Sequence, residues 1–154
     1  MSRYYVIILV IILVTAFFLK MVSWFSPKHE SHITINGQSI IVDVARSALE
    51  QQRGLSGRLS LPFDHGMLFV YSQKTTPQFW MWHMFFPLDI VWVADGRIVA
   101  MTSNIPAPSL TTSQDTLPRY TPKEPVTMVL EVNAGLAERF GWKIGDKVDA
   151  ILSE

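Results

Sequence analysis

The sequence of 154 residues contains no cysteine. This absence excludes disulfide bonds, thiolate zinc sites, cysteine nucleophiles and lipid attachment to a cysteine. A domain of roughly 120 residues does not need such cross-links, because it can bury about two thirds of the surface of its unfolded chain. The part of the chain that folds must therefore be held together by a hydrophobic core.

The sequence also lacks an excess of charge of either sign. Lysine and arginine number 13 and aspartate and glutamate also number 13, and residues 33–154 carry 10 basic against 12 acidic side chains. Proteins that bind nucleic acid usually present a strongly basic surface. We therefore predict no nucleic-acid partner.

Motifs of common cofactor and enzyme sites are missing as well. The sequence contains no Gly-x-Gly-x-x-Gly, no phosphate loop and no His-Glu-x-x-His, and we predict no cofactor. The Gly-Leu-Ser-Gly stretch at 54–57 differs from a nucleophile elbow, because it follows a predicted helix instead of a strand. Ser56 is therefore not predicted to be a nucleophile.

A long apolar run occupies the N-terminus. Residues 4–19 contain Thr15 as their only polar member, and apolar character resumes after Lys20 as far as Phe25. At about 1.5 Å per residue, a helix over this stretch spans roughly 33 Å, enough to cross a bilayer core of about 30 Å. We predict one transmembrane helix within residues 1–25. A cleaved signal peptide is the alternative, although the sequence after the run lacks a small-x-small cleavage site.

The composition divides the chain into three parts: an anchor at 1–25, a short tether at 26–31 and a globular domain at 32–154. The short N-terminal tail suggests a signal anchor that leaves the domain outside the cytoplasm. The expected partner of residues 4–25 is the membrane, and the domain is expected to be a soluble monomer.

The domain is predicted to be α+β and predominantly β, a small antiparallel barrel-like fold with two short helices. Asn36-Gly37 and Asp95-Gly96 favour type I′ hairpin turns, and Ser47 with Glu50 fits a capping box at a helix start. The predicted strands are 33–35, 39–44, 66–71, 78–82, 88–93, 97–102, 126–132 and 147–152, and the predicted helices are 48–53 and 134–140, the second capped by Asn133.

Two acidic residues stand inside apolar strands. Asp89 and Glu131 are therefore predicted to be buried, and a buried carboxylate must be paired, hydrogen-bonded or protonated. The two acids could form a general acid/base pair with separated pKa values, and His83 is a third candidate catalytic residue. Alternatively, each acid is structural and accepts hydrogen bonds from loop amides or from an arginine, with Arg58 and Arg53 as the available partners.

A second cluster combines sulfur, imidazole and aromatic side chains. Met81, His83 and Met84 are soft ligands that suit Cu(I), although methionine in an aromatic-rich segment is more often packed against rings. Residues 103–125 contain five prolines and are predicted to form a long surface loop. This loop could form one wall of a groove whose floor includes Trp82 or Trp92, with Arg58 as a further ligand contact, suited to a peptide or glycan of the cell envelope. Alternatively, the loop is structural and simply caps the end of the barrel.

Several short motifs occur in an order that resembles the family called domain of unknown function 192. They are Glu50-x-x-Arg53-Gly54-Leu55-x-x-Arg58, Leu61-Pro62, Gly66-Met67-Leu68-Phe69, Phe79-Trp80-Met81, Pro87-Leu88-Asp89-Ile90, Glu131-Val132-x-Ala134-Gly135 and Gly145-Asp146. The resemblance implies a small β-rich fold, often exported or membrane-tethered, without an assigned reaction, ligand or partner. It places the family's polar residues at Arg58, Asp89, Glu131 and Asp146. This sequence departs from the family pattern at Ser56 and at Trp82-His83-Met84.

These features together favour a membrane-anchored extracytoplasmic domain that acts as a binding or accessory module at the cell envelope. An envelope enzyme that uses Asp89 and Glu131 is the alternative. Copper binding through Met81, His83 and Met84 is a third interpretation.

Overall fold

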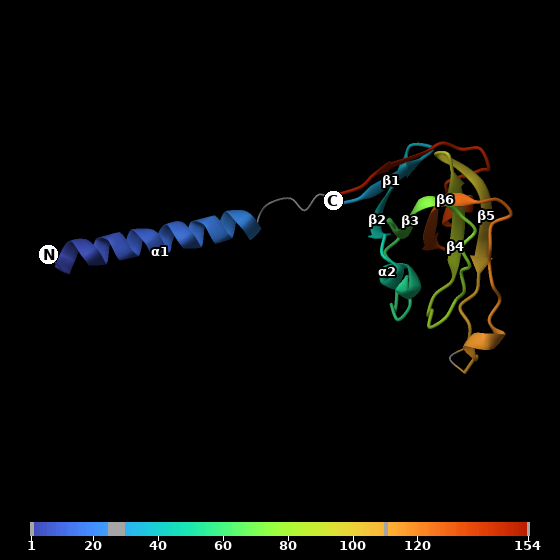
Figure 1. The fold of residues 1–154 in the computed structure, drawn as a ribbon, viewed down its shortest axis with the longest axis horizontal. Coiled ribbons are helices and arrows are strands. Elements are labelled where there is room, and N and C mark those ends of the chain that lie inside the picture. Colours follow the sequence, from blue (N-terminus) through green and yellow to red (C-terminus); the bar gives the residue numbers. More distant parts are fainter. Residues whose placement is uncertain (1, 25–29, 110, 154) are drawn as a thin grey trace.

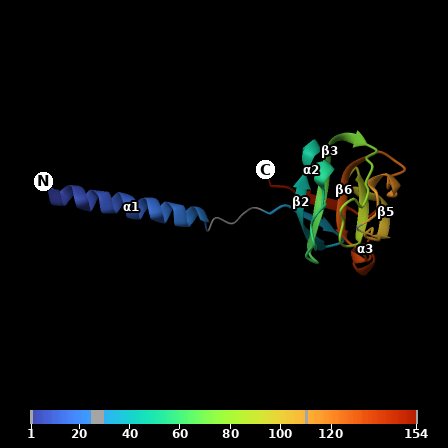
Figure 2. The same cartoon turned by 90° about the horizontal axis from the view of Figure 1, so that it is seen from below.

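A computed structural model describes residues 2–24, 30–109 and 111–153. Helix α1 (Ser2–Trp24) lies apart from the domain formed by the rest of the chain (Figures 1 and 2). Most of the predicted tether at 26–31 falls outside the described residues. Across the described ranges, no helix is both long enough and apolar enough to cross a membrane. The transmembrane part of the fold prediction is therefore not supported.

The domain is a single twisted sheet with a few short helices, which confirms the predominantly β prediction. The strand order is β5-β4-β6-β3-β2-β1-β7. The strands are β1 (His32–Ile35), β2 (Gln38–Ala45), β3 (His65–Thr75), β4 (Leu88–Ala94), β5 (Arg97–Ile105), β6 (Val126–Asn133) and β7 (Val148–Ile151), and the helices of the domain are α2 (Ala48–Arg53), the 3₁₀ turn η1 (Gln114–Thr116) and α3 (Leu136–Arg139).

The sheet curls into a half-barrel. Its two edge strands, β5 and β7, meet where each begins: the Val148 amide donates to the Gly96 carbonyl at 2.8 Å, and the Ile98 amide donates to the Asp146 carbonyl at 3.0 Å. The predicted barrel-like closure is therefore present at this end of the sheet.

One strand pair departs from the predicted antiparallel pattern. β2 and β3 are parallel, with Val42 opposite Gly66 and Val44 opposite Leu68. The connection between them contains α2, and such a crossover returns the chain to the end of the sheet where the first strand began. The helix itself was predicted correctly, but its consequence for strand direction was not.

Local turn chemistry is confirmed where the sequence signal is strong. Asn36 and Gly37 have φ angles of 51° and 76°, as a type I′ hairpin turn requires. The Ser47 hydroxyl accepts a hydrogen bond from the Glu50 amide, and the Glu50 carboxylate accepts one from the Ser47 amide at 2.8 Å. This reciprocal pair is the predicted capping box at the start of α2.

Two element predictions are wrong. Residues 78–82 do not form a strand: Phe79 makes only an isolated bridge with Tyr120, and the chain turns directly afterwards. Asn133 does not cap the last helix. Its side-chain amide donates instead to the Leu61 carbonyl at 3.0 Å, and α3 begins after Gly135.

The central strands β3, β4 and β6 are covered on both faces. The half-barrel interior contains Ile33, Ile35, Ile40, Val42, Leu68, Val91, Val93, Ile98, Leu130, Val132, Leu136, Ala137, Trp142 and Val148. The other face carries an apolar outer layer, which the segment after α2 and the segment 77–87 help to cover; its buried members are Ala45, Leu55, Leu61, Met67, Phe69, Phe79, Met81, Met84, Phe86, Leu88, Ile90, Trp92, Ile105, Val126 and Val129. This two-sided burial explains why all seven residues of β4 are buried.

Candidate functional site

Glu131 projects from the middle of the sheet into the apolar outer layer. It lies on β6 opposite Met67 of β3 and opposite Ile90 of β4, and residues paired in this way point to the same face of a sheet. Its relative exposure is 6%. The carboxylate therefore lies between hydrophobic neighbours.

Burial dominates the electrostatics of this group. Desolvation raises the pKa of Glu131 from its ordinary value of 4.5 to about 8, and within the described part of the chain no hydrogen bond or opposite charge offsets that rise. A carboxyl group with a pKa of about 8 is mostly protonated near neutral pH. Small changes in its surroundings therefore decide whether it carries a charge.

The carboxylate borders a cavity of about 420 Å³ between α2 and the outer layer, which we call the Glu131 pocket. Aromatic rings, a thioether and a few polar groups meet there. The lining includes Gln51, Arg53, Gly54, Ser56, Phe69, Tyr71, Gln78, Phe79, Trp80, Met84 and Glu131. A pocket in which aromatic and apolar side chains meet several convergent polar groups can serve as a ligand site.

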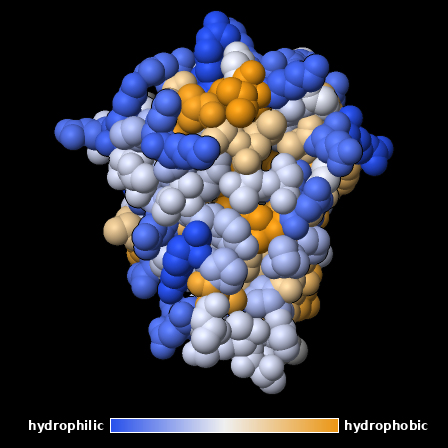
Figure 3. All heavy atoms as spheres, turned by 90° about the vertical axis from the view of Figure 1, so that its right-hand side faces the viewer, coloured by the Kyte–Doolittle hydropathy of each residue, from blue (hydrophilic) through white to orange (hydrophobic). Residues whose placement is uncertain are grey.

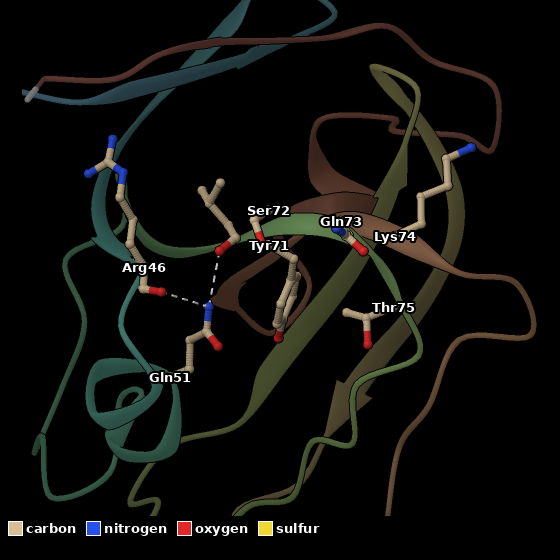
Figure 4. A pocket seen from close by; sticks show the side chains of 8 residues that line it. Arg46, Gln51, Tyr71, Ser72, Gln73, Lys74 and Thr75 are labelled. Carbon is tan, nitrogen blue, oxygen red and sulfur yellow. Dashed lines mark hydrogen bonds between the residues drawn. The ribbon is translucent and has the colours of Figure 1, made fainter.

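Helix α2 is fixed in place beside this pocket by Gln51. The side-chain amide of Gln51 donates to the Val70 carbonyl of β3 at 3.0 Å and to the Arg46 carbonyl at 3.4 Å (Figure 4). These bonds tie α2 to β3 at the point where β2 has ended. Gln51 also lines an open hollow of about 580 Å³, the α2–β3 hollow, together with Arg46 and residues 70–75 of β3.

Tyr71 belongs to both cavities and was not singled out from the sequence. In Figure 4 its ring lies between Gln51 and Thr75. Burial raises the pKa of the Tyr71 phenol to about 12, and the nearby Glu131 carboxylate adds to the effect. The alternation Met67, Phe69, Tyr71 along β3 was the available signal, because it places all three side chains on the face that Glu131 shares.

Asp89 has a different environment. It is 1% exposed, and its carboxylate accepts hydrogen bonds from the backbone amides of Asn104 at 2.7 Å and Ala137 at 3.1 Å. These bonds join β4 to the end of β5 and to α3. Asp89 and Glu131 point to opposite faces of the sheet, because Asp89 pairs with Val132 across the β4–β6 ladder. The two acids therefore do not form an acid/base pair.

The two arginines that were considered as partners of these acids do not bind them. Arg58 forms an ion pair with Asp43 at 2.8 Å, and both side chains are more than a third exposed. Arg58 lines a small hollow of about 360 Å³ together with Arg53 and Glu50. Arg53 is exposed and stands at the border between this hollow and the Glu131 pocket.

The soft-ligand cluster is dispersed by the fold. Met81 and Met84 are each 4% exposed in the outer layer, whereas His83 is exposed and stacks on the Trp82 ring at 4.2 Å. His83 has a φ angle of 54°, so the chain turns there instead of continuing as a strand. The described residues also contain no group of three or more histidine, aspartate or glutamate side chains that could hold a metal.

Trp92 is one of the two tryptophans that the sequence suggested for the floor of a groove beside the proline-rich loop. It is 1% exposed, and its ring nitrogen donates to the Thr102 hydroxyl at 3.1 Å. A hollow of about 360 Å³, the Trp92 hollow, lies between β5 and residues 121–124 of the proline-rich loop. Trp82 does not line it; its carbonyl accepts a hydrogen bond from the Ser56 hydroxyl at 2.8 Å.

Comparisons with known proteins give a family without a described activity. A crystal structure of a protein of unknown function from Novosphingobium aromaticivorans is similar, with 32% identity and a TM-score of 0.68 over 77% of this chain and 83% of the other. A second, from a protein of Sinorhizobium meliloti proposed to be a transcription regulator, has 28% identity and a TM-score of 0.67 over 79% and 92% of the two chains. A search of curated proteins finds no match. The family model described as "Uncharacterized ACR, COG1430", the domain of unknown function 192, matches residues 31–150, and the chain belongs to this family.

Proposed function

We propose that this protein is a membrane-attached binding module of the cell envelope, with its domain on the extracytoplasmic side and its ligand site in the Glu131 pocket. The observation that carries the proposal is the Glu131 carboxylate, which is 6% exposed within an apolar layer and yet borders a cavity. A buried carboxylate without a partner costs stability. A residue that reduces stability in this way is typical of a functional site.

The character of the cavity supports ligand binding. Rings of Phe69, Tyr71 and Trp80 offer apolar contact, while Gln78 and Ser56 offer hydrogen bonds. Such a combination suits a side chain of an envelope peptide or a sugar of an envelope glycan, because aromatic rings pack on apolar faces while polar groups fix orientation.

Exposed apolar side chains on α1 support attachment to a membrane through residues 4–25. Ile8, Leu13 and Phe17 are 54%, 61% and 70% exposed, and transfer of such surface from water is favourable by about 25 cal/mol per Å². By contrast, the face of the domain in Figure 3 carries only separate apolar areas among polar atoms. Full-length chain should remain in the membrane fraction after carbonate extraction, and a chain that begins at residue 30 should not. Equal release of both chains would contradict attachment.

Methionine methyl groups offer a direct test of the ligand site. Met84 lines the Glu131 pocket, Met101 lines the Trp92 hollow and Met128 lies against the half-barrel interior. The sample is full-length protein in maltoside micelles, labelled with ¹³C-methyl methionine. Soluble peptide and glycan fragments of cell wall should shift the methyl signal of Met84 and leave the signal of Met128 unchanged. A shift at Met101 alone would move the site to the Trp92 hollow, and an unchanged Met84 signal with every fragment would contradict the proposal.

Acid–base catalysis by Glu131 alone is the second candidate function. Burial raises the pKa of this carboxyl to about 8, which lies in the range suited to a general acid or base near neutral pH. Conversion of an envelope fragment by wild-type protein but not by Glu131→Gln would favour an enzyme. Binding without any chemical change would favour the module.

A further inference from the structure

We infer that the Glu131 pocket selects an alkylammonium group, such as the head of a choline compound or the amine of a lysine side chain. The inference rests on the proposed function and names the chemistry that the same pocket recognises. Three features of the pocket carry it: its carboxylate without a partner, its aromatic lining and its size.

The charge argument starts from what the carboxylate lacks. Within the described residues, burial is the cause that raises the pKa of Glu131, and no hydrogen bond or ion pair reaches its carboxylate, although Arg53 lines the same pocket. An ionised carboxylate offers only acceptors, so it repels anionic ligands and attracts a donor that carries positive charge. An ammonium group would supply the opposite charge that a buried carboxylate requires.

The aromatic lining favours the same chemistry. Phe69 and Phe79 meet edge to face at 4.8 Å, and Tyr71 and Trp80 complete the ring-lined part of the pocket. The face of an aromatic ring attracts cations, and the attraction is stronger where water is excluded. The Arg119 guanidinium already covers one face of the Trp80 ring at 4.3 Å from its centre, so a ligand cation would contact the other face of this ring or the other rings of the lining.

The backbone at Gly54 lies close to the carboxylate. A Cβ atom at this position would lie 3.3 Å from the Phe69 ring and 3.9 Å from Oε2 of Glu131. A side chain at position 54 would therefore crowd the Phe69 ring and fill the edge of the pocket beside the carboxylate. The cavity of about 420 Å³ has room for a small alkylammonium compound.

Two other charged or titratable side chains of the described residues line this pocket. Arg53 comes from α2 and is exposed, so it can contact a polar or anionic group at the far end of the ligand. Tyr71 comes from β3, and the pKa of its phenol is raised to about 12, so it stays neutral near pH 7. Because the pKa of Glu131 is about 8, the ionised fraction rises steeply between pH 6 and pH 9. Affinity for an ammonium group should rise at least tenfold over that range.

The test uses full-length protein in maltoside micelles at pH 9, where Glu131 is mostly ionised, with ¹³C-methyl methionine as the reporter. The probes are choline, n-butylammonium and a short-chain phosphatidylcholine below its micelle concentration, which separate a free cation, an amine and a lipid headgroup. The control ligand is 3,3-dimethyl-1-butanol, in which a carbon atom replaces the charged nitrogen of choline. Glu131→Gln is the test variant, and Glu138→Gln, an exposed glutamate on α3, is the matched control.

At least one cationic probe should shift the methyl signal of Met84 and leave the signals of Met101 and Met128 unchanged. The affinity of Glu131→Gln for that probe should be at least tenfold lower than that of wild type, and the affinity of Glu138→Gln should equal that of wild type. Equal binding of dimethylbutanol, equal binding by Glu131→Gln, or no Met84 shift with any cation would overturn the inference. If cell-wall fragments shift Met84 while cations do not, the ammonium inference fails and the proposed function stands. If neither shifts Met84, both fail.

Discussion

Replacing Glu131 with glutamine should stabilise the protein, increasingly so as the pH rises. The carboxyl has a pKa of about 8 in the folded state and 4.5 as an ordinary group, so between these values the folded chain binds more protons than the unfolded chain. Stability therefore falls as pH rises through this window. Each pH unit corresponds to about 1.4 kcal/mol, which gives a penalty on the order of 3 kcal/mol at pH 7 and 5 kcal/mol above pH 8.

Glutamine has nearly the same shape and no charge, so the variant should lose this pH dependence. Urea unfolding of both full-length proteins, followed by tryptophan fluorescence at pH 5, 7 and 9, measures the difference. The unfolding free energy of the variant should match that of wild type within about 1 kcal/mol at pH 5 and exceed it clearly at pH 9. The two proteins differ only at position 131, so the comparison isolates the effect of this carboxyl group. A stability difference that stays constant across this range, or a less stable variant at pH 9, would refute the reasoning from burial.

Three further changes test other parts of the structure. Asp89→Asn should lower the unfolding free energy by about 2–4 kcal/mol, because an asparagine side chain has one acceptor oxygen where Asp89 uses two to accept from the backbone amides of Asn104 and Ala137. An unchanged urea midpoint would show that these bonds are not needed. Arg58→Ala should cost less than about 1 kcal/mol, since its ion pair with Asp43 is partly exposed; a larger loss in the same assay would reveal a role beyond that pair. Removal of residues 1–25 should leave a soluble, folded monomer by size-exclusion chromatography and circular dichroism, and an aggregated or unfolded product would show that the domain depends on α1.

The parts of the fold that the sequence predicted well are those determined by neighbouring residues. Hairpin turns at Asn36-Gly37 and Asp95-Gly96, and the capping box of α2, depend on backbone angles and side-chain bonds within a few positions. The prediction of a strand at 78–82 failed because Phe79 and Met81 pack in the outer layer, while the chain makes only an isolated bridge to Tyr120. Apolar alternation cannot distinguish a strand in a sheet from a chain packed across one.

The candidate site was only half predictable. Burial of Glu131 follows from the apolar run around it, and this prediction required no tertiary information. Tyr71 and Gln51 could not be assigned to the same site, because their approach depends on the parallel β2–β3 pair and on the position of α2 above it. The face that Asp89 occupies likewise depends on the register between β4 and β6.

The side-chain carboxyl carbon of Glu131 offers the most direct measurement of whether this group is buried without a partner beside the pocket. Its ¹³C chemical shift in the full-length protein in maltoside micelles can be followed from pH 3 to pH 10 and assigned through the Glu131→Gln variant. Burial predicts a titration midpoint near pH 8. A midpoint near pH 4.5 would show a solvated or paired carboxylate and would contradict the Glu131 pocket as the functional site.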